Sequence, residues 1–306
     1  MRSFVIIATK GRARELSILL DFLNRQTLRP EYSVIVGTDA TDIAGSESHP
    51  LIKNGKGSAI ISPRVGLTAQ RNYGLEALEK MGFFAEEKGD FFCAFFDDDY
   101  RMADDWLEYA DKRFAANDIV GLTGLVLGDG VRKGGYSEEQ ARSFLNEKTM
   151  PQKHWAPVGH EREVKSVYGC NMAFKDAVIR VTRFDENTPL YAWQEDRDYT
   201  GQAKKLGRII YFPGCRGVHL GTQSGGRTSG LMFGYSQIAN PIYFFRKGTI
   251  DFRSTAYLLC RPFLSNILRS FFRGGRIDYR GRLRGNFIAI VDFLSFRSDP
   301  KRILSL

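Results

Sequence analysis

Three consecutive carboxylates, Asp97, Asp98 and Asp99, are the residues of this chain best placed to do chemistry. They directly follow the apolar run 91–96, whose composition predicts a short buried strand, so all three emerge at its C-terminal end. Open α/β sheets bind their ligands at that end. Because side chains alternate along an extended chain, Asp97 and Asp99 share one side, where their oxygens suit Mg²⁺ or Mn²⁺ carried on a diphosphate. A solvated acidic turn or a helix N-cap would give the same pattern.

Other polar residues stand beside predicted elements. Glu195 and Asp196 open a predicted helix, where carboxylates serve either acid–base chemistry or the helix dipole, and Asp198 suits the dipole well. Arg71 lies just inside another predicted helix, where its guanidinium could pair bidentately with a diphosphate or lie exposed. His219 follows a late strand, where a lone histidine is more often a packed or exposed residue.

The global composition describes a globular protein. The chain has 306 residues, of which 43% are apolar, and can bury one large core or two smaller ones. Its four cysteines lie far apart without a C-x-x-C pair, which favours a reducing compartment. No apolar run approaches the ~18 residues of a membrane span, and the chain opens on a strand-like run without a basic leader. We expect a cytoplasmic protein, with contact to the membrane surface left open.

The positive charge is concentrated near the C-terminus. Of the net charge of +9, residues 261–306 contribute +7, from ten Lys and Arg against three Asp. Apolar residues within 263–272 recur at helical spacing and are flanked by arginines, which predicts a basic amphipathic helix. Such a helix could lie on an anionic membrane at the cytoplasmic face, or pack on the core. Nucleic acid is a third partner class, but no nucleic-acid-binding motif accompanies the charge, so we expect none.

Strand and helix patterns alternate through the first half. Strands are predicted at 4–8, 32–36, 59–62 and 91–96, and helices at 14–25 and 67–81. This alternation predicts an α/β fold with a mostly parallel central sheet flanked by helices. Further strands are predicted at 121–127, 164–174 and 209–212, and a helix within 195–207. We expect one catalytic domain over 1–230 and a helical, basic C-terminal extension over 231–306.

Five motifs in this order resemble the motif set of family 2 glycosyltransferases. They are 4–12 (FVIIATKGR), 66–72 (GLTAQRN), 96–99 (FDDD), 168–174 (YGCNMAF) and 195–196 (ED). The match covers roughly residues 1–220. The resemblance implies the nucleotide-sugar-binding GT-A fold and a transfer that inverts the configuration of the sugar.

The resemblance also implies a donor site. Its members would be Thr9, Arg12 and Asp39 at the nucleoside, Arg71 at the diphosphate, and Asp97 and Asp98 beside them. A UDP-sugar is the expected donor. Many relatives carry two consecutive acids after the second strand, where this chain has Gly37 and Thr38 before Asp39, so the base is left open. Arg227, in the Gly-rich segment 221–230, could close over phosphate as part of a mobile lid.

The same resemblance assigns the metal and the acceptor side. Asp99, with Asp97 and His219, would hold Mg²⁺ or Mn²⁺. Of the three consecutive aspartates, Asp98 would then have a structural role. Asp196 would be the general base for the acceptor hydroxyl. The acceptor would meet Glu195 and Trp193, with Tyr191 nearby, and a wall formed by Gly169, Cys170 and Asn171.

The expected function is an inverting, metal-dependent glycosyltransferase of bacterial exopolysaccharide or envelope-glycan assembly, acting on a saccharide or a lipid-linked saccharide. A sugar-phosphate nucleotidyltransferase would share the architecture, but it usually opens with a Gly-rich loop containing Arg and Pro, and residues 9–13 are too short for that. A non-catalytic, membrane-associated nucleotide-sugar-binding module is the third hypothesis. The carboxylates at every expected chemical position argue against it.

Overall fold

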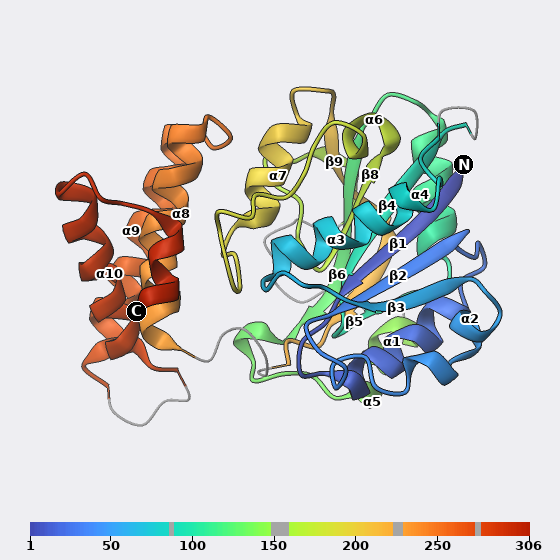
Figure 1. Ribbon diagram of the computed structural model, residues 1–306, viewed down its shortest axis with the longest axis horizontal. Helices are drawn as coiled ribbons and strands as arrows, with labels where there is room; N and C mark the ends of the chain where they lie inside the picture. Colours follow the sequence, from blue (N-terminus) through green and yellow to red (C-terminus); the bar gives the residue numbers. More distant parts are fainter. Residues whose placement is uncertain (86–88, 148–158, 223–228, 273–276) are drawn as a thin grey trace.

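The computed structural model describes residues 1–85, 89–147, 159–222, 229–272 and 277–306, and Figure 1 shows a twisted sheet flanked by helices beside a group of C-terminal helices. The elements of the sheet region are, in chain order, β1 (Arg2–Ala8), α1 (Ala13–Asn24), β2 (Tyr32–Gly37), η1 (Ser46–Ser48), α2 (Pro50–Lys53), β3 (Gly57–Ile61), α3 (Leu67–Lys80), β4 (Phe91–Asp97), β5 (Tyr100–Met102), α4 (Trp106–Ala115), β6 (Gly121–Asp129), η3 (Gly130–Arg132), α5 (Glu138–Glu147), β7 (Arg162–Glu163), β8 (Asn171–Lys175), α6 (Asp176–Ile179), α7 (Glu195–Ala203) and β9 (Ile209–His219). The α/β prediction is confirmed.

The strands form one sheet in the order β3-β2-β1-β4-β8-β6-β9-β5, with β7 paired to β9. The first four are parallel, and Ala8 at the end of β1 is in register with Asp97 at the end of β4. β8 runs antiparallel to both β4 and β6, while β6 and β9 are parallel. The C-terminal ends of β1, β2, β4, β6 and β9 therefore meet at one edge, which is where the polar residues gather.

The central strands are apolar on both faces because helices cover both. Phe4 and Ile6 of β1 point into a core shared with α3 and α7, whereas Val5 and Ile7 point into a core shared with α1 and α4. This split follows the two-residue alternation of a strand. It also explains why these strands read as continuous hydrophobic runs.

The predicted strand 164–174 is wrong over most of its length, because only β8 (Asn171–Lys175) is a strand there. Side chains satisfy the preceding backbone: the N–H of Val167 donates to Thr200 Oγ1, and that of Tyr168 donates to Thr123 Oγ1. Donors used in this way cannot form a ladder with a neighbouring strand. The strand predicted at 209–212 is longer than expected, since β9 continues to His219.

The C-terminal extension comprises α8 (Gly230–Lys247), α9 (Phe252–Ser270), α10 (Tyr279–Leu294) and the 3₁₀-helix η4 (Pro300–Ser305), drawn in orange and red in Figure 1. Several contacts tie α8 to the sheet region: among them, Lys247 bridges Asp185 and Asp198, and Asn240 Nδ2 donates to the carbonyl of Trp193. No helix among the described residues has the length and apolarity that crossing a membrane requires.

Candidate active site

The acidic triplet forms the turn between β4 and β5, at the C-terminal edge of the sheet. Asp97 is the last residue of β4 and remains partly exposed, whereas Asp98 and Asp99 are buried. His219 ends β9 and faces the triplet. The sequence therefore brings carboxylates and an imidazole to one place from strands more than a hundred residues apart.

Asp97, Asp99 and His219 form a potential metal site. Each offers one ligand atom, and these atoms all lie within 4.8 Å of one another. His219 Nε2 is 3.3 Å from the buried Asp99 Oδ1, so a protonated imidazole forms an ion pair with this oxygen. A divalent cation bound here would take over from the proton of His219 in compensating the buried carboxylate. The residues thus fit a divalent ion.

His219 is held from behind by residues that the sequence did not single out. Its Nδ1 lies 3.2 Å from Asp129 Oδ1 and 3.2 Å from the Tyr168 hydroxyl, which itself donates to Asp129 Oδ2 at 3.0 Å. Asp129 closes β6, so a polar residue at a strand end was the available signal. A carboxylate on one ring nitrogen fixes the tautomer and aims the other nitrogen at a metal.

Replacing Asp129 with asparagine is expected to weaken Mn²⁺ binding by roughly 10- to 100-fold, because the imidazole loses the carboxylate that orients it and increases its basicity. Titration of the protein with Mn²⁺, followed by electron paramagnetic resonance of the free ion, measures this without any substrate. Asp118→Asn, at an exposed carboxylate paired with Arg113, is the matched control and should bind as the wild type does. Equal affinities for Asp129→Asn and the wild type would exclude this role.

The charges around His219 predict that metal binding depends on pH. Burial alone would lower the pKa of His219, but Asp99 and Asp129 outweigh it and raise that pKa well above 6.5. Burial would raise the pKa of Asp129, but the contacts with His219 outweigh it and lower that pKa to about 2. A proton on Nε2 competes with a metal ion, so the apparent Mn²⁺ affinity should rise with pH until it levels off above the raised folded-state pKa of His219.

His219→Gln should flatten the dependence of Mn²⁺ affinity on pH, and a slope unchanged in that variant would contradict the assignment. The free energy of unfolding of the metal-free protein depends on pH in the opposite direction. The raised pKa of His219 stabilises the folded state fully below pH 6.5, and that stabilisation is lost as the pH rises through the folded-state value.

Asp98 is a structural carboxylate, and this corrects the roles expected of two neighbours. The Thr9 hydroxyl donates to Asp98 Oδ2 at 2.8 Å, and Arg12 donates to Oδ1 at 2.7 Å. Thr9 is buried, and its hydroxyl is engaged by Asp98. Arg12 also donates to the carbonyl of Thr222, the second residue of the Gly-rich segment. Burial, only partly offset by Arg12, raises the pKa of Asp98 to about 7.

The loop after β2 contains an unforeseen buried carboxylate. Asp39, expected at the nucleoside, is exposed, and its carboxylate caps its own turn by accepting from Thr41. Asp42 is buried and accepts from the N–H groups of Gly11 and Thr38 at 2.5 and 2.7 Å. Asp42 therefore joins the loops after β1 and β2, which gives the two loops a fixed relative position.

Arg71 is buried between carboxylates, which corrects the expectation that it meets the diphosphate. Its guanidinium donates to Glu195 at 2.5 Å, to Asp97 at 3.0 Å and to the carbonyl of Gly169 at 2.9 Å, and only 1% of its side chain is exposed. Arg71 thus links the metal-binding edge to the start of α7. Burial outweighs the Arg71 contact and raises the pKa of Glu195 to about 8, so Glu195 is a support residue held away from solvent.

Asp196 lies on the first turn of α7, beside this network. Its Oδ2 accepts from the N–H of Gly169 at 3.1 Å, and burial raises its pKa. The loop that leads into α7 has a strained backbone, because Leu190, Ala192 and Gln194 adopt left-handed φ angles of 60°, 51° and 70°. Each such residue costs about 1–3 kcal/mol, and strain of this kind clusters at functional sites. A partly buried carboxylate with a raised pKa is suited to accept a proton.

Comparisons with known proteins identify the fold. No protein-family model and no curated protein matches the sequence. Among solved structures, S. aureus TarS matches with a TM-score of 0.55 at 15% identity, over 89% of this chain and 44% of the TarS chain, so this chain spans less than half of that protein. Mannosyltransferase PcManGT from Pyrobaculum calidifontis, in complex with GDP-Man and Mn²⁺, matches with a TM-score of 0.55 at 16% identity, over 99% of this chain and 85% of the other. GalNAc-T7 with UDP, GalNAc and Mn²⁺ matches with a TM-score of 0.55 at 11% identity, over 89% and 58%. The chain has a GT-A fold.

Within the GT-A domain, the expected acceptor wall is corrected. Gly169 lies against Glu195 and Asp196, and a Cβ there would lie 3.0 Å from Glu195 Oε1, so any side chain would press on that carboxylate. Cys170 is buried in the core. Asn171 is fully buried and donates to the Tyr100 hydroxyl at 2.9 Å. These three residues pack behind the site and help to hold its side chains in place.

Two aromatic residues that were expected near the acceptor lie on the loop before α7. Trp193 and Tyr191 are partly exposed, and both rings contact Phe233 of α8, with centroids 6.2 and 5.8 Å apart. The C-terminal helices therefore fix the loop that precedes Asp196. Arg227, expected at the phosphate, lies outside the described residues.

Proposed function

We propose that this chain is a metal-dependent glycosyltransferase that transfers a sugar from a nucleoside diphosphate to a hydroxyl of an acceptor. One observation carries the proposal: on a GT-A fold, the cluster of Asp97, Asp99 and His219 is joined to the start of α7 through the buried Arg71. Asp196 follows directly at that helix. The two halves of a transfer reaction, a cation site for the leaving group and a carboxylate for the incoming group, are thereby adjacent.

The chemistry follows from these positions. A divalent ion bound by Asp97, Asp99 and His219 would neutralise the charge that develops on the departing diphosphate. Asp196 accepts the proton of the acceptor hydroxyl as its oxygen attacks the anomeric carbon, and the bond from that carbon to the phosphate oxygen breaks. A single displacement of this kind inverts the anomeric configuration. Arg71 keeps the metal-binding carboxylate and α7 in fixed relation, so its role is positioning.

A UDP-sugar with Mn²⁺ is the first donor to test, with Asp39 and the loop fixed by Asp42 on the nucleoside side. We propose a saccharide or lipid-linked saccharide as acceptor, in bacterial polysaccharide assembly at the cytoplasmic face of the membrane. In this proposal residues 1–230 form the catalytic domain, and 231–306 an extension that contacts the membrane.

A thermal-shift screen tests the function. The nucleoside diphosphates of uridine, guanosine, cytidine, adenosine and thymidine are added with and without Mn²⁺. We expect one of them to raise Tm only when Mn²⁺ is present, because a ligand bound to the folded state stabilises it by mass action. Asp99→Asn should abolish the shift. The absence of a shift with every nucleotide in the presence of Mn²⁺ would reject the proposed donor class.

A further inference from the structure

The C-terminal helices pack through small residues. A Cβ at Gly234 of α8 would lie 2.0 Å from the carbonyl oxygen of Arg282, and one at Gly285 of α10 would lie 2.1 Å from that of Leu231. The backbones of α8 and α10 are therefore in contact, and any side chain would force them apart. Gly230 and Gly281 precede these two by four residues, so each helix carries a G-x-x-x-G pattern. Such patterns let helices associate without a large apolar interface.

A polar network lies inside the same bundle, in addition to a buried apolar cluster. Asn266 Nδ2 donates to Gln237 at 2.8 Å and to Asn286 at 2.7 Å, and Asn286 Nδ2 donates to the carbonyl of Gly234 at 2.6 Å. All three side chains are buried. Amide networks of this kind join helices whose outer surface is apolar.

Large apolar side chains lie on the outside of α9 and α10. On α9 the buried residues are Thr255, Leu258 and Asn266, while Leu264 is 57% and Leu268 is 65% exposed. The exposed face of α9 is therefore more apolar than that of an ordinary surface helix, whose solvent side is polar. An exposed apolar surface of this kind marks a place where burial against a partner or a membrane is favourable.

The exposed residues form one stripe on each helix. The stripe on α9 consists of Arg253, Tyr257, Cys260, Leu264, Leu268 and, at its end, Phe271; that on α10 consists of Arg280, Arg284, Phe287, Val291 and Leu294. Their spacing of three and four residues keeps each stripe on one face. The rings of Phe263 and Phe287 are in contact, with centroids 5.8 Å apart, and connect the two helices beside the stripes.

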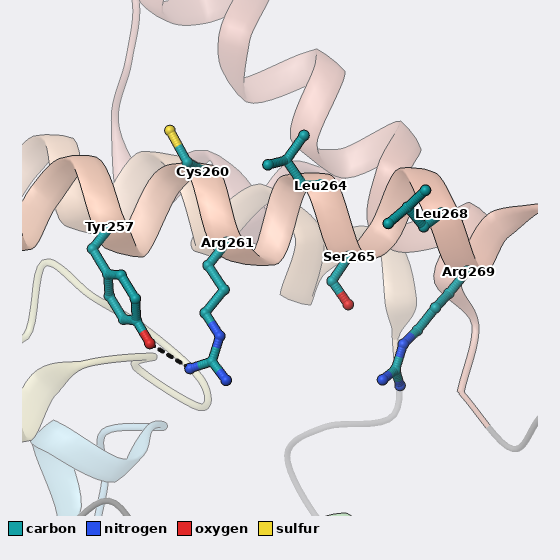
Figure 2. A pocket seen from close by; sticks show the side chains of 7 residues that line it. All are labelled: Tyr257, Cys260, Arg261, Leu264, Ser265, Leu268 and Arg269. Atoms are coloured by element: carbon teal, nitrogen blue, oxygen red, sulfur yellow. Dashed lines mark hydrogen bonds between the residues drawn. The ribbon is translucent and has the colours of Figure 1, made fainter.

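Basic side chains line the edge of the apolar stripe on α9. Figure 2 shows Cys260 and Leu264 pointing to one side of the helix in this view, and Arg261 and Arg269 pointing to the other. Arg261 donates to the Tyr257 hydroxyl at 2.5 Å, which holds the guanidinium along the helix. Arginine stems can lie along an apolar surface while their charged ends reach phosphate.

We propose that the stripes of α9 and α10 form a membrane-docking surface that inserts into one leaflet of an anionic bilayer. None of the described helices can span a membrane, so the helices lie in the interface with their apolar residues among the acyl chains. Anionic headgroups complement the exposed arginines. A second copy of this chain would bring the same positive charges together, which argues against it as the occupant. This proposal deepens the membrane-side location of the proposed function.

Cys260 makes the surface directly testable, because it is exposed whereas Cys93, Cys170 and Cys215 are buried. The full chain is labelled at Cys260 with a polarity-sensitive fluorophore and mixed with vesicles of phosphatidylcholine, with or without phosphatidylglycerol. We expect binding and a blue-shifted emission with phosphatidylglycerol, quenching by nitroxide groups on the acyl chains, and little binding to phosphatidylcholine alone. No sugar donor or metal is needed, so a failure here leaves the transferase proposal standing.

The variant Leu264→Glu with Leu268→Glu should lower vesicle binding of the unlabelled protein by about tenfold or more, because charge enters the inserted stripe. Val181→Glu, at a position 68% exposed and outside the bundle, is the matched control and should bind like the wild type. Undiminished binding of the double variant, an unquenched probe at Cys260, or wild-type protein that stays in solution would overturn the proposal. A dimer that the double variant abolishes, without vesicle binding, would assign the surface to a second copy.

Discussion

Asp99→Asn is expected to lower kcat/KM for sugar transfer by roughly 1,000-fold, because removing the charge of the central metal ligand removes the stabilisation of the leaving diphosphate. The side chain keeps its shape, so its contact with the N–H of Thr222, at 2.8 Å, can persist. His219 and Arg12 outweigh burial and hold the pKa of Asp99 below its ordinary value, so the wild-type residue is ionised and ready to bind a cation at neutral pH. Initial rates measured at saturating Mn²⁺ give the effect.

The matched control is Asp104→Asn, at an exposed carboxylate beside the same strand pair that forms only a surface contact with Arg25. It should retain wild-type kcat/KM. If Asp99→Asn keeps the wild-type rate and Mn²⁺ requirement, the metal site lies elsewhere.

Asp196→Asn is expected to reduce kcat by about 100- to 10,000-fold while the donor binds with unchanged Kd, because only the proton acceptor is lost. Asparagine can still accept from the N–H of Gly169, so the start of α7 keeps its geometry. Donor affinity by calorimetry and transfer by product analysis separate binding from chemistry.

Asp198→Asn, two residues along the same helix, gives the comparison. Asp198 is buried and bonded to Lys247 and Thr249, so its loss should lower the free energy of unfolding by loosening α8 from α7, with a smaller effect on kcat. Asp196 would be excluded as the base if its asparagine variant transferred sugar at the wild-type rate.

The fold and the centre of the site follow from local sequence signals. The apolar runs at 4–8 and 91–96 predict buried strands because both faces of each strand are covered by helices, and the alternation of strands with helices predicts their parallel pairing. Asp97 and Asp99 share one side of the chain because of strand alternation. His219 was a candidate only through the motif resemblance, since a histidine after a strand carries no signal of its own.

The residues that support the site depend on contacts that no local pattern encodes. Arg71 has the same helical context whether it is exposed or buried, and its burial depends on Glu195, which lies 124 residues away in the sequence. The hydrogen bond of Thr9 to Asp98 and the contact of Asp129 with His219 likewise depend on which strand ends meet in the sheet. Residues 164–170 carry a strand-like composition, yet side-chain acceptors occupy their backbone donors.

Anomalous scattering from crystals grown with MnCl₂ and a nucleoside diphosphate tests the central claim most directly. The account predicts a manganese peak bonded to carboxylate oxygens of Asp97 and Asp99 and to His219 Nε2, with the diphosphate on the same ion. A peak at any other position, or bound nucleotide with no manganese at these three residues, would contradict it.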